Sequence, residues 1–230
     1  AHAPQDEADL SPDTLERRRL AFDELLAHQL ALSMVRHHNR SLPGRRLKGS
    51  GRLQVKARTA LPYKLTKSQE KAIAEIQADM DSDSRMLRLL QGDVGSGKTV
   101  VAFFAMLAAA EAGAQSALMA PTEILARQHF ATLQPLAESV GLRLELLTGR
   151  DKGKSRERIL AGLADGAVHI VVGTHARVQD EVDFDDLGFV VIDEQHRFGV
   201  HQRLSLASKG RGVHMLVMTA TPIPRTMMLD

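Results

Sequence analysis

The sequence predicts an α/β fold with a mostly parallel β-sheet flanked by helices. Three observations support this prediction. Short apolar runs alternate with helical segments from about Leu61 onward, which is the arrangement of successive βαβ units. A glycine-rich loop, Gly92–Thr99, lies between an apolar run and a helical segment. Two carboxylates, Asp193 and Glu194, directly follow another apolar run, and the sites of such folds gather at the carboxyl ends of parallel strands.

The composition is that of a globular domain. A length of 230 residues is enough for one domain with a sizeable core and an additional element. Apolar residues make up 43% and charged residues 25%, which excludes a disordered chain. No apolar run approaches the roughly 20 residues that span a bilayer, and no segment resembles a signal peptide. Cysteine is absent, so disulfides and thiolate chemistry are excluded. We therefore expect a cytoplasmic protein.

Six apolar runs and three amphipathic segments define the expected elements. The expected strands are Met86–Leu90, Ser116–Ala120, Arg143–Leu147, His169–Val172, Phe189–Ile192 and Met215–Met218. The expected helices, which combine good helix formers with apolar periodicity, are Thr99–Glu111, Glu123–Ser139 and Ser155–Leu163. Since strands and helices alternate, the strands are expected to run parallel, with helices on both faces of the sheet.

The amino-terminal quarter has a different pattern. Residues 11–38 predict one long helix, because Ser11 can cap it and an apolar stripe of helical spacing follows. Residues 39–60 contain proline and several glycines and predict a loop, with at most a short strand or helix after it. We therefore expect a helical linker and basic segment over 1–60, followed by the main domain over 61–230.

A long stretch of this region carries charge of one sign. No acidic residue occurs between Leu25 and Gln69. The basic residues within it are Arg36, Arg40, Arg45, Arg46, Lys48, Arg52, Lys56, Arg58, Lys64 and Lys67. Such a stretch suits a polyanion such as nucleic acid, or it is a solvated linker whose charges keep it soluble. Charge alone leaves both interpretations open.

The glycine-rich loop predicts a nucleotide site. It matches G-x-x-x-x-G-K-[ST] in full, after an expected strand and before an expected helix. Glycines allow the backbone to wrap around phosphates, and the positive end of the helix adds attraction. Lys98 would meet the β- and γ-phosphates, and the Thr99 hydroxyl would ligate Mg²⁺. The expected nucleotide-binding residues of the loop are Gly92, Gly95, Ser96, Gly97, Lys98 and Thr99.

The carboxylate pair completes this prediction. A magnesium–nucleotide site needs a carboxylate at the end of a neighbouring buried strand. Asp193 follows the apolar run Phe189–Ile192 and would face Mg²⁺, while Glu194 would polarise the attacking water as general base. Such a pair alone is common in surface turns. Together with the phosphate loop about a hundred residues earlier, it predicts an ATP-hydrolysing site with Lys98, Asp193 and Glu194 as catalytic residues.

Several motifs resemble those of superfamily 2 helicases, in the order in which that superfamily has them. Asp193-Glu194-Gln195-His196 is a variant of the D-E-x-H signature. The other matching segments are Pro62–Gln69, Ala120–Gln128, Leu147–Gly149, Val172–Ala176 and Thr219–Pro222. Two longer stretches, Asp193–Val200 and Thr219–Thr226, are similar to the RecG family of branched-DNA helicases and to its relative, the transcription-repair coupling factor. Gln195-His196 favours the RecG family.

The resemblance implies a RecA-like P-loop domain, the first of two motor domains in a DNA helicase that uses ATP and Mg²⁺. It implies that Gln69 reads the adenine edge. The residues that it assigns to the DNA backbone are Thr122, Arg127, Thr148, Gly149, Gly173, Thr174 and His175. Those that it assigns to coupling of hydrolysis to strand movement are Gln195, His196, Thr219, Ala220 and Thr221. The implied partners are branched or forked DNA, a second motor domain and a wedge domain.

Other interpretations stay open. Thr122 could simply cap a helix, Gly173 could simply end a strand, and His196 could be a buried histidine. The chain could be the motor of the coupling factor. A P-loop kinase or transporter ATPase would not account for Gln69 and Asp193 together with the later motifs. Since no second motor domain follows in this sequence, we expect a fragment that binds nucleotide and DNA but turns over little ATP.

Overall fold

The computed structural model of this chain describes residues 43–149, 153–174, 182–193 and 212–220, together with Arg19, Phe22 and Leu26. The chain divides into two compact units, Ala1–Leu42 and Pro43–Asp230. The helix expected over 11–38 lies outside the described residues, except that Arg19, Phe22 and Leu26 are helical. All further description concerns the second unit.

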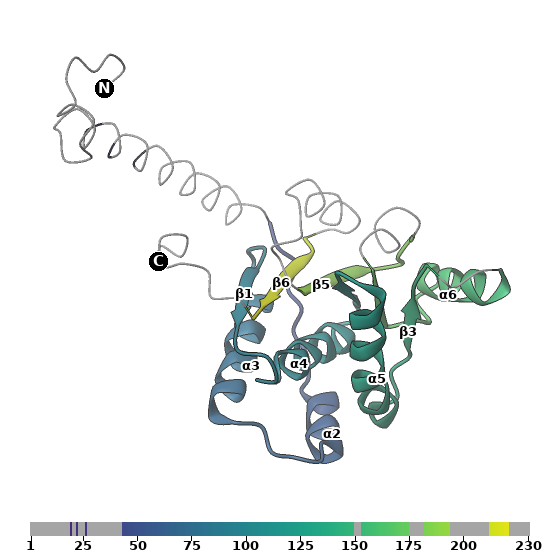
Figure 1. Ribbon diagram of the computed structural model, residues 1–230, viewed down its shortest axis with the longest axis horizontal. Coiled ribbons are helices and arrows are strands. Elements are labelled where there is room, and N and C mark those ends of the chain that lie inside the picture. The colour runs from purple at the N-terminus through teal and green to yellow at the C-terminus, as the bar shows by residue number, and fades with distance from the viewer. Residues whose placement is uncertain are drawn as a thin grey trace, which may run out of the picture. The chain divides into compact units, whose positions relative to one another are not determined.

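A single parallel sheet forms the centre of this unit (Figure 1). Its strand order within the described residues is β1-β6-β5-β2-β4-β3. The strands are β1 (Leu87–Gln91), β2 (Gln115–Ala120), β3 (Leu144–Leu147), β4 (Ile170–Thr174), β5 (Leu187–Asp193) and β6 (His214–Thr219). Each lies within two residues of an expected strand at both ends. The predicted α/β fold is confirmed.

Five helices accompany the sheet within the described ranges: α2 (Arg52–Ala60), α3 (Lys67–Met80), α4 (Lys98–Glu111), α5 (Glu123–Val140) and α6 (Lys154–Ala164). The last three confirm the expected helices. The sequence analysis did not predict α3, which begins with a capping box between Thr66 and Gln69. None of the helices in these ranges is long and apolar enough to cross a lipid bilayer.

The core has two layers, one on each face of the sheet. Alternate strand residues such as Leu118, Ile170 and Val191 pack with α3, α4 and α5. The intervening strand residues pack with Ile159 and Leu163 of α6. Because the central strands are covered on both faces, they are continuous apolar runs in the sequence, as parallel strands usually are. In α4 every residue from Val100 to Ala109 is buried, so this helix is apolar all round.

The boundary expected at residue 60 differs from that of the structure, which lies at 42/43. Residues 43–60 pack on the domain and are not a linker. Leu47 is only 1% exposed in the core, and its N–H donates to the Met80 carbonyl at 2.8 Å. Ala57 of α2 is fully buried as well. The expected loop followed by a short helix is present, since residues 44–50 have no regular secondary structure and α2 follows them. One buried leucine and a backbone hydrogen bond nevertheless hold this loop on the domain.

Candidate nucleotide site at the carboxyl edge of the sheet

The strand register brings the predicted motifs to one edge of the sheet. Gln91, which precedes the phosphate loop, pairs with Thr219, and Asp193 pairs with Met218. In the other half of the sheet Ala120 pairs with Thr174. Since all of these strands are parallel, their carboxyl ends and the loops that follow lie along the same edge.

The phosphate loop turns from β1 into the first residue of α4. Gly95 and Gly97 have φ angles of 81° and 83°, which favour glycine, and Gly97 is the residue before the helix. A Cβ atom at Gly97 would lie 2.4 Å from Nε2 of Gln69, so any other residue there would also displace the Gln69 side chain. The loop is closed by a hydrogen bond from the Ser96 N–H to the Asp93 carbonyl at 3.1 Å. This is the backbone shape that cradles phosphate.

Lys98 lies over this loop. Its ammonium donates to the carbonyl oxygens of Gly92 at 2.6 Å and Asp93 at 2.9 Å. Two neutral acceptors hold the charge beside the amino terminus of α4, and no carboxylate neutralises it among these contacts. The ammonium is therefore positioned to meet an anion that enters the loop.

Gln69 contacts the phosphate loop directly. Its Oε1 accepts from the Thr66 N–H at 2.9 Å, and its Nε2 donates to the Ser96 carbonyl at 2.8 Å. The Thr66 hydroxyl in turn accepts from the Gln69 N–H at 3.2 Å. The capping box of α3 therefore fixes the side chain that was expected to read adenine, and that side chain bridges α3 to the loop.

Thr99 and Asp193 are joined by a residue that the sequence analysis missed. The ring of His129, on α5, lies with Nδ1 3.3 Å from the Thr99 hydroxyl and with Nε2 2.7 Å from Oδ2 of Asp193. Both members of the second contact are largely buried, with side chains 12% and 11% exposed. The sequence pattern that could have indicated it is the position of His129 directly after the matched segment Ala120–Gln128.

The oxygen atoms of Thr99 and Asp193 are ligands that suit Mg²⁺. A hydroxyl and a single carboxylate, beside a loop shaped for phosphate, are the protein ligands this ion commonly takes, because it keeps several waters and binds phosphate oxygens. Among the described residues there is no group of three His, Cys, Asp or Glu side chains that could hold a metal ion by itself. The expected ligands Thr99 and Asp193 lie close together, because the ring of His129 makes a hydrogen bond with each of them.

The candidate DNA contacts form a second cluster along the same edge. Thr122 caps α5 by accepting from the Leu125 N–H at 3.3 Å. Arg127 pairs with Glu123 at 3.0 Å and donates to the Thr148 hydroxyl at 3.4 Å. Gly149 follows Thr148 in the chain. Two motifs far apart in the sequence are thereby in contact.

The last members of this cluster lie at the end of β4. Gly173 pairs with Met119 and with Leu147, next to Thr148, and Thr174 is the residue after it. Thr122 acts as a helix cap and Gly173 lies inside a strand. The helix-cap interpretation of Thr122 therefore holds, whereas Gly173 does not end its strand, because β4 continues to Thr174. Neither position excludes contact with a phosphate.

The remaining candidates are partly outside the described residues. Thr219 ends β6, is 3% exposed, and its carbonyl accepts from the Gly92 N–H at 3.3 Å, so it touches the phosphate loop. Ala220 follows it. His175, Glu194, Gln195, His196 and Thr221 lie outside the described residues.

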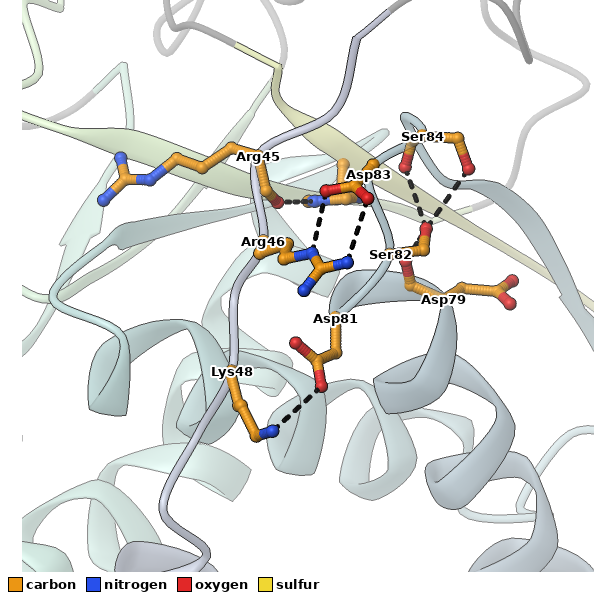
Figure 2. A network of polar contacts seen from close by, with 9 residues as sticks. Arg45, Arg46, Lys48, Asp79, Asp81, Ser82, Asp83 and Ser84 are labelled. Carbon is orange, nitrogen blue, oxygen red and sulfur yellow. Dashed lines mark hydrogen bonds and ion pairs between the residues drawn. The ribbon is translucent and has the colours of Figure 1, made fainter.

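Four cations of the basic stretch are paired with acidic side chains from elsewhere in the chain. Arg45 pairs with Asp186. Figure 2 shows the guanidinium of Arg46 facing Asp83, at 2.8 and 2.9 Å, and the ammonium of Lys48 facing Asp81 at 3.6 Å. Further along, Arg58 pairs with Glu70 at 2.6 Å and lies 4.7 Å from the centre of the Phe104 ring.

A buried histidine fixes the start of this segment. The Nε2–H of His214 donates to the Arg45 carbonyl at 2.5 Å, and its Nδ1 accepts from the Met86 N–H at 3.0 Å. Burial lowers the pKa of His214, so the neutral ring is the form that makes both bonds. Residues 43–51, which we call the strap, are thus anchored by charge pairs, backbone bonds and a buried ring. The idea of a solvated linker does not fit the strap.

Comparison with known proteins identifies the family. A family model described as DEAD/DEAH box helicase matches residues 66–229, which include the phosphate loop and Asp193. The chain belongs to the DEAD/DEAH box helicase family. Membership of this family implies the use of ATP. It also agrees with the resemblance of the sequence motifs to those of superfamily 2 helicases.

Individual relatives indicate which kind of helicase this chain resembles. This chain is 51% identical over 91% of its length to the ATP-dependent DNA helicase RecG of Streptococcus pneumoniae, and 48% identical over 92% to that of Escherichia coli O157:H7. It spans 31% of the length of each of these relatives. The resemblance to the RecG family is confirmed.

Solved structures agree with this. A structure of RecG bound to a three-way DNA junction superposes with a TM-score of 0.78 at 46% identity, covering 92% of this chain and 28% of that chain. Yeast Dbp5 bound to RNA and ADP BeF3 gives a TM-score of 0.58 at 19% identity, covering 79% of this chain and 47% of that chain. At that identity the second likeness concerns the fold alone.

Proposed function

We propose that this chain forms the first motor domain of an ATP-dependent DNA helicase that acts on branched DNA. The observation that carries the proposal is the phosphate loop joined to Asp193 through one imidazole, at the carboxyl edge of the parallel sheet. The similarity to RecG supports DNA as the substrate, and the relative bound to a three-way junction supports a branched one.

In this proposal the loop binds the phosphates of ATP. The N–H groups at the amino end of α4, a helix of 14 residues, and the turns at Gly95 and Gly97 supply the donors. Lys98 moves its ammonium from the loop carbonyls to the β- and γ-phosphates. Thr99 and Asp193 hold Mg²⁺, which when bound neutralises charge that develops on the phosphate oxygens. Glu194 is the proposed general base and Gln69 the proposed adenine contact.

The second cluster provides the proposed track for DNA. Arg127 and Thr148 touch each other from two motifs, and a cation beside hydroxyl and backbone donors is suited to phosphate oxygens. We assign to this track Thr122, Arg127, Thr148, Gly149, Gly173, Thr174 and His175. We assign coupling of hydrolysis to movement to Gln195, His196, Thr219, Ala220 and Thr221, and its support is the contact of Thr219 with the phosphate loop. The proposed partners in the whole protein are a second motor domain and a wedge domain.

Nucleotide binding tests the first half of the proposal. A ligand at about 100 times its dissociation constant stabilises a protein by roughly 2.7 kcal/mol. For a chain of this size about 1 kcal/mol raises the melting temperature by about 2–4 °C. Mg·ADP should therefore raise melting by about 5–11 °C in the wild type and by much less in Lys98→Ala, measured by differential scanning calorimetry.

A matched control shows whether the smaller melting shift of Lys98→Ala is specific to the phosphate loop or would follow the loss of a lysine at the start of any helix. Lys154 is the first residue of α6 and, like Lys98, follows a glycine of positive φ, but it lies on a different helix and its glycine does not complete a G-x-x-x-x-G sequence. Lys154→Ala should keep the wild-type shift. Equal shifts in Lys98→Ala and Lys154→Ala would contradict the assignment of the loop.

Turnover on DNA tests the second half. The segment of Streptococcus pneumoniae RecG that matches this chain can be replaced by the chain itself, which supplies the other domains of a relative. We expect ATP hydrolysis by this chimera to rise when forked DNA is added, and Glu194→Gln to abolish hydrolysis because the water loses its base. A folded chimera that binds Mg·ADP yet shows no DNA-stimulated hydrolysis would refute the helicase function while leaving nucleotide binding intact.

A further inference from the structure

One imidazole joins the two expected magnesium ligands. Thr99 belongs to α4 and Asp193 to β5, while His129 comes from a third element, α5. The ring contacts the hydroxyl of one at 3.3 Å and a carboxylate oxygen of the other at 2.7 Å. Both ring nitrogens are therefore used, and both partners are functional candidates, which is unusual for a histidine that only fills space.

The chemistry of the partners sets the direction of both hydrogen bonds. An ionised carboxylate only accepts, so Nε2 of His129 carries the hydrogen and donates to Asp193. In the neutral ring Nδ1 is then an acceptor, and the Thr99 hydroxyl donates to it. The result is a directed chain from the threonine hydroxyl through the imidazole to the carboxylate.

This chain orients both oxygen ligands. A hydroxyl that ligates a cation uses an oxygen lone pair, and it keeps a hydrogen that needs an acceptor. Nδ1 of His129 is that acceptor, so it turns the lone pairs of Thr99 away from itself. The bond to Oδ2 holds the plane of the Asp193 carboxylate and leaves Oδ1 outside this hydrogen bond. Partners of this kind fix ligand orientation and tune metal affinity.

We propose that His129 is a positioning residue for the magnesium site. Resting on the nucleotide site proposed above, the inference is that His129 sets the orientation of Thr99 and Asp193 and thereby the affinity for Mg²⁺ in the presence of nucleotide. It touches neither the phosphates nor the ion in this role. His129 lies on α5 two residues after Arg127, which is one of the candidate DNA contacts. The same helix therefore contributes a residue to the candidate DNA contacts and a residue to the nucleotide site.

The test measures magnesium dependence without turnover. With this chain at saturating ADP, Mg²⁺ is titrated and the concentration that gives half of the maximal rise in melting temperature is recorded. ADP affinity is measured separately in EDTA. For His129→Ala we expect that magnesium concentration to rise about 10-fold or more, as is typical when a ligand loses its orienting partner. The ADP affinity in EDTA should stay as in the wild type.

Two further variants make the outcome decisive. His169→Ala is the matched control, because Nδ1 of His169 also makes a hydrogen bond, here by accepting from the Arg143 N–H at 3.1 Å, but His169 precedes β4 at the amino edge of the sheet. It should change stability and leave the magnesium midpoint unchanged. His129→Gln keeps an amide donor for Asp193, so its midpoint should lie between those of the wild type and His129→Ala.

The outcomes are distinguishable from failure of the proposed function. If the wild type depends on Mg²⁺ and His129→Ala has the same midpoint, the inference is overturned and the nucleotide site stands. It is also overturned if His129→Ala and His129→Gln both fail to fold, since the ring is then structural. A wild type whose ADP binding ignores Mg²⁺ would contradict the proposed magnesium site and this inference with it.

Discussion

The amino terminus of α2 is capped from a distant helix, and this makes a sharp prediction. Its first residue follows Gly51, which has no side chain to cap it. Glu111, the last residue of α4, does so instead: its Oε2 accepts from the Gly51 N–H at 2.6 Å and its Oε1 from the Leu53 N–H at 2.5 Å. One carboxylate therefore satisfies two of the donors that a helix start leaves unpaired, and it also places negative charge at the positive end of the helix.

The cost of removing this carboxylate follows from these contacts. Loss of a helix cap costs about 0.5–2 kcal/mol, and a hydrogen bond to a charged group contributes about 1.5–3 kcal/mol. Because Glu111 is only partly buried, water replaces some of this. We expect Glu111→Ala to lower the free energy of unfolding by about 2 kcal/mol, or melting by about 4–8 °C. Glu111→Gln keeps one good acceptor and should lose about half as much.

Calorimetry or urea unfolding of the chain would measure the difference. Glu138→Ala is the control, because Glu138 lies on α5 and its carboxylate accepts from the Gln134 side chain at 3.0 Å. A surface change of that kind should stay within about 0.5 kcal/mol. If Glu111→Ala melts at the same temperature as Glu138→Ala, the cap contributes nothing and the strap-to-α2 connection must be held by the buried side chains alone.

Two further predictions concern the basic stretch and the histidine that anchors the strap. Arg46→Ala with Asp83→Ala should leave DNA affinity nearly unchanged, since the two charges cancel as a pair within the fold. Lys64→Ala with Lys67→Ala should weaken it and flatten the slope of log affinity against log salt by about 0.9 per phosphate lost. Salt titrations of DNA binding decide, and equal losses in the two double variants would contradict this division. Because burial lowers the pKa of His214, the unfolded chain binds that proton more tightly. Stability should therefore be present above about pH 6.5 and fall as the pH drops through that value, by at most about 1.4 kcal/mol per unit. Urea midpoints between pH 7.5 and 5.5 should fall less in His214→Asn, and an unchanged pH dependence would refute the role of the ring.

The sheet and the phosphate loop could be predicted because their causes are local. A strand covered on both faces is a continuous apolar run, so the centre of β5 is visible in the sequence as Phe189–Ile192. The loop needs glycine at Gly95 and Gly97 for positive φ and a helix directly after it, and all of these occur within one short segment. The helix α3 was predictable for the same reason, since Thr66 and Gln69 form a capping box.

His129 could not be predicted in the same way, because its role depends on long-range contacts. A histidine within an amphipathic helix is compatible with a surface or a core position. Only the packing of α5 beside the ends of α4 and β5 gives its two nitrogens a hydroxyl and a carboxylate. The contact with Asp193 joins residues 64 positions apart. The sequence pattern around the phosphate loop therefore predicts the ligands of the site and not the group that orients them.

The strap shows why charge along a chain differs from charge on a surface. Between Leu25 and Gln69 the sequence is basic only, and a polyanion-binding surface is the natural inference. Folding brings acidic side chains from α3, from the loop after it and from the residue before β5 against this stretch. Each such pair neutralises a cation locally, so it adds little to the long-range field that attracts DNA.

By contrast, Lys64 and Lys67 are exposed and make no ion pair with any of the described residues. They lie just before Gln69, which contacts the phosphate loop. Lys64 and Lys67, beside the nucleotide site, are therefore better suited to attract a nucleic acid than the cations of the strap.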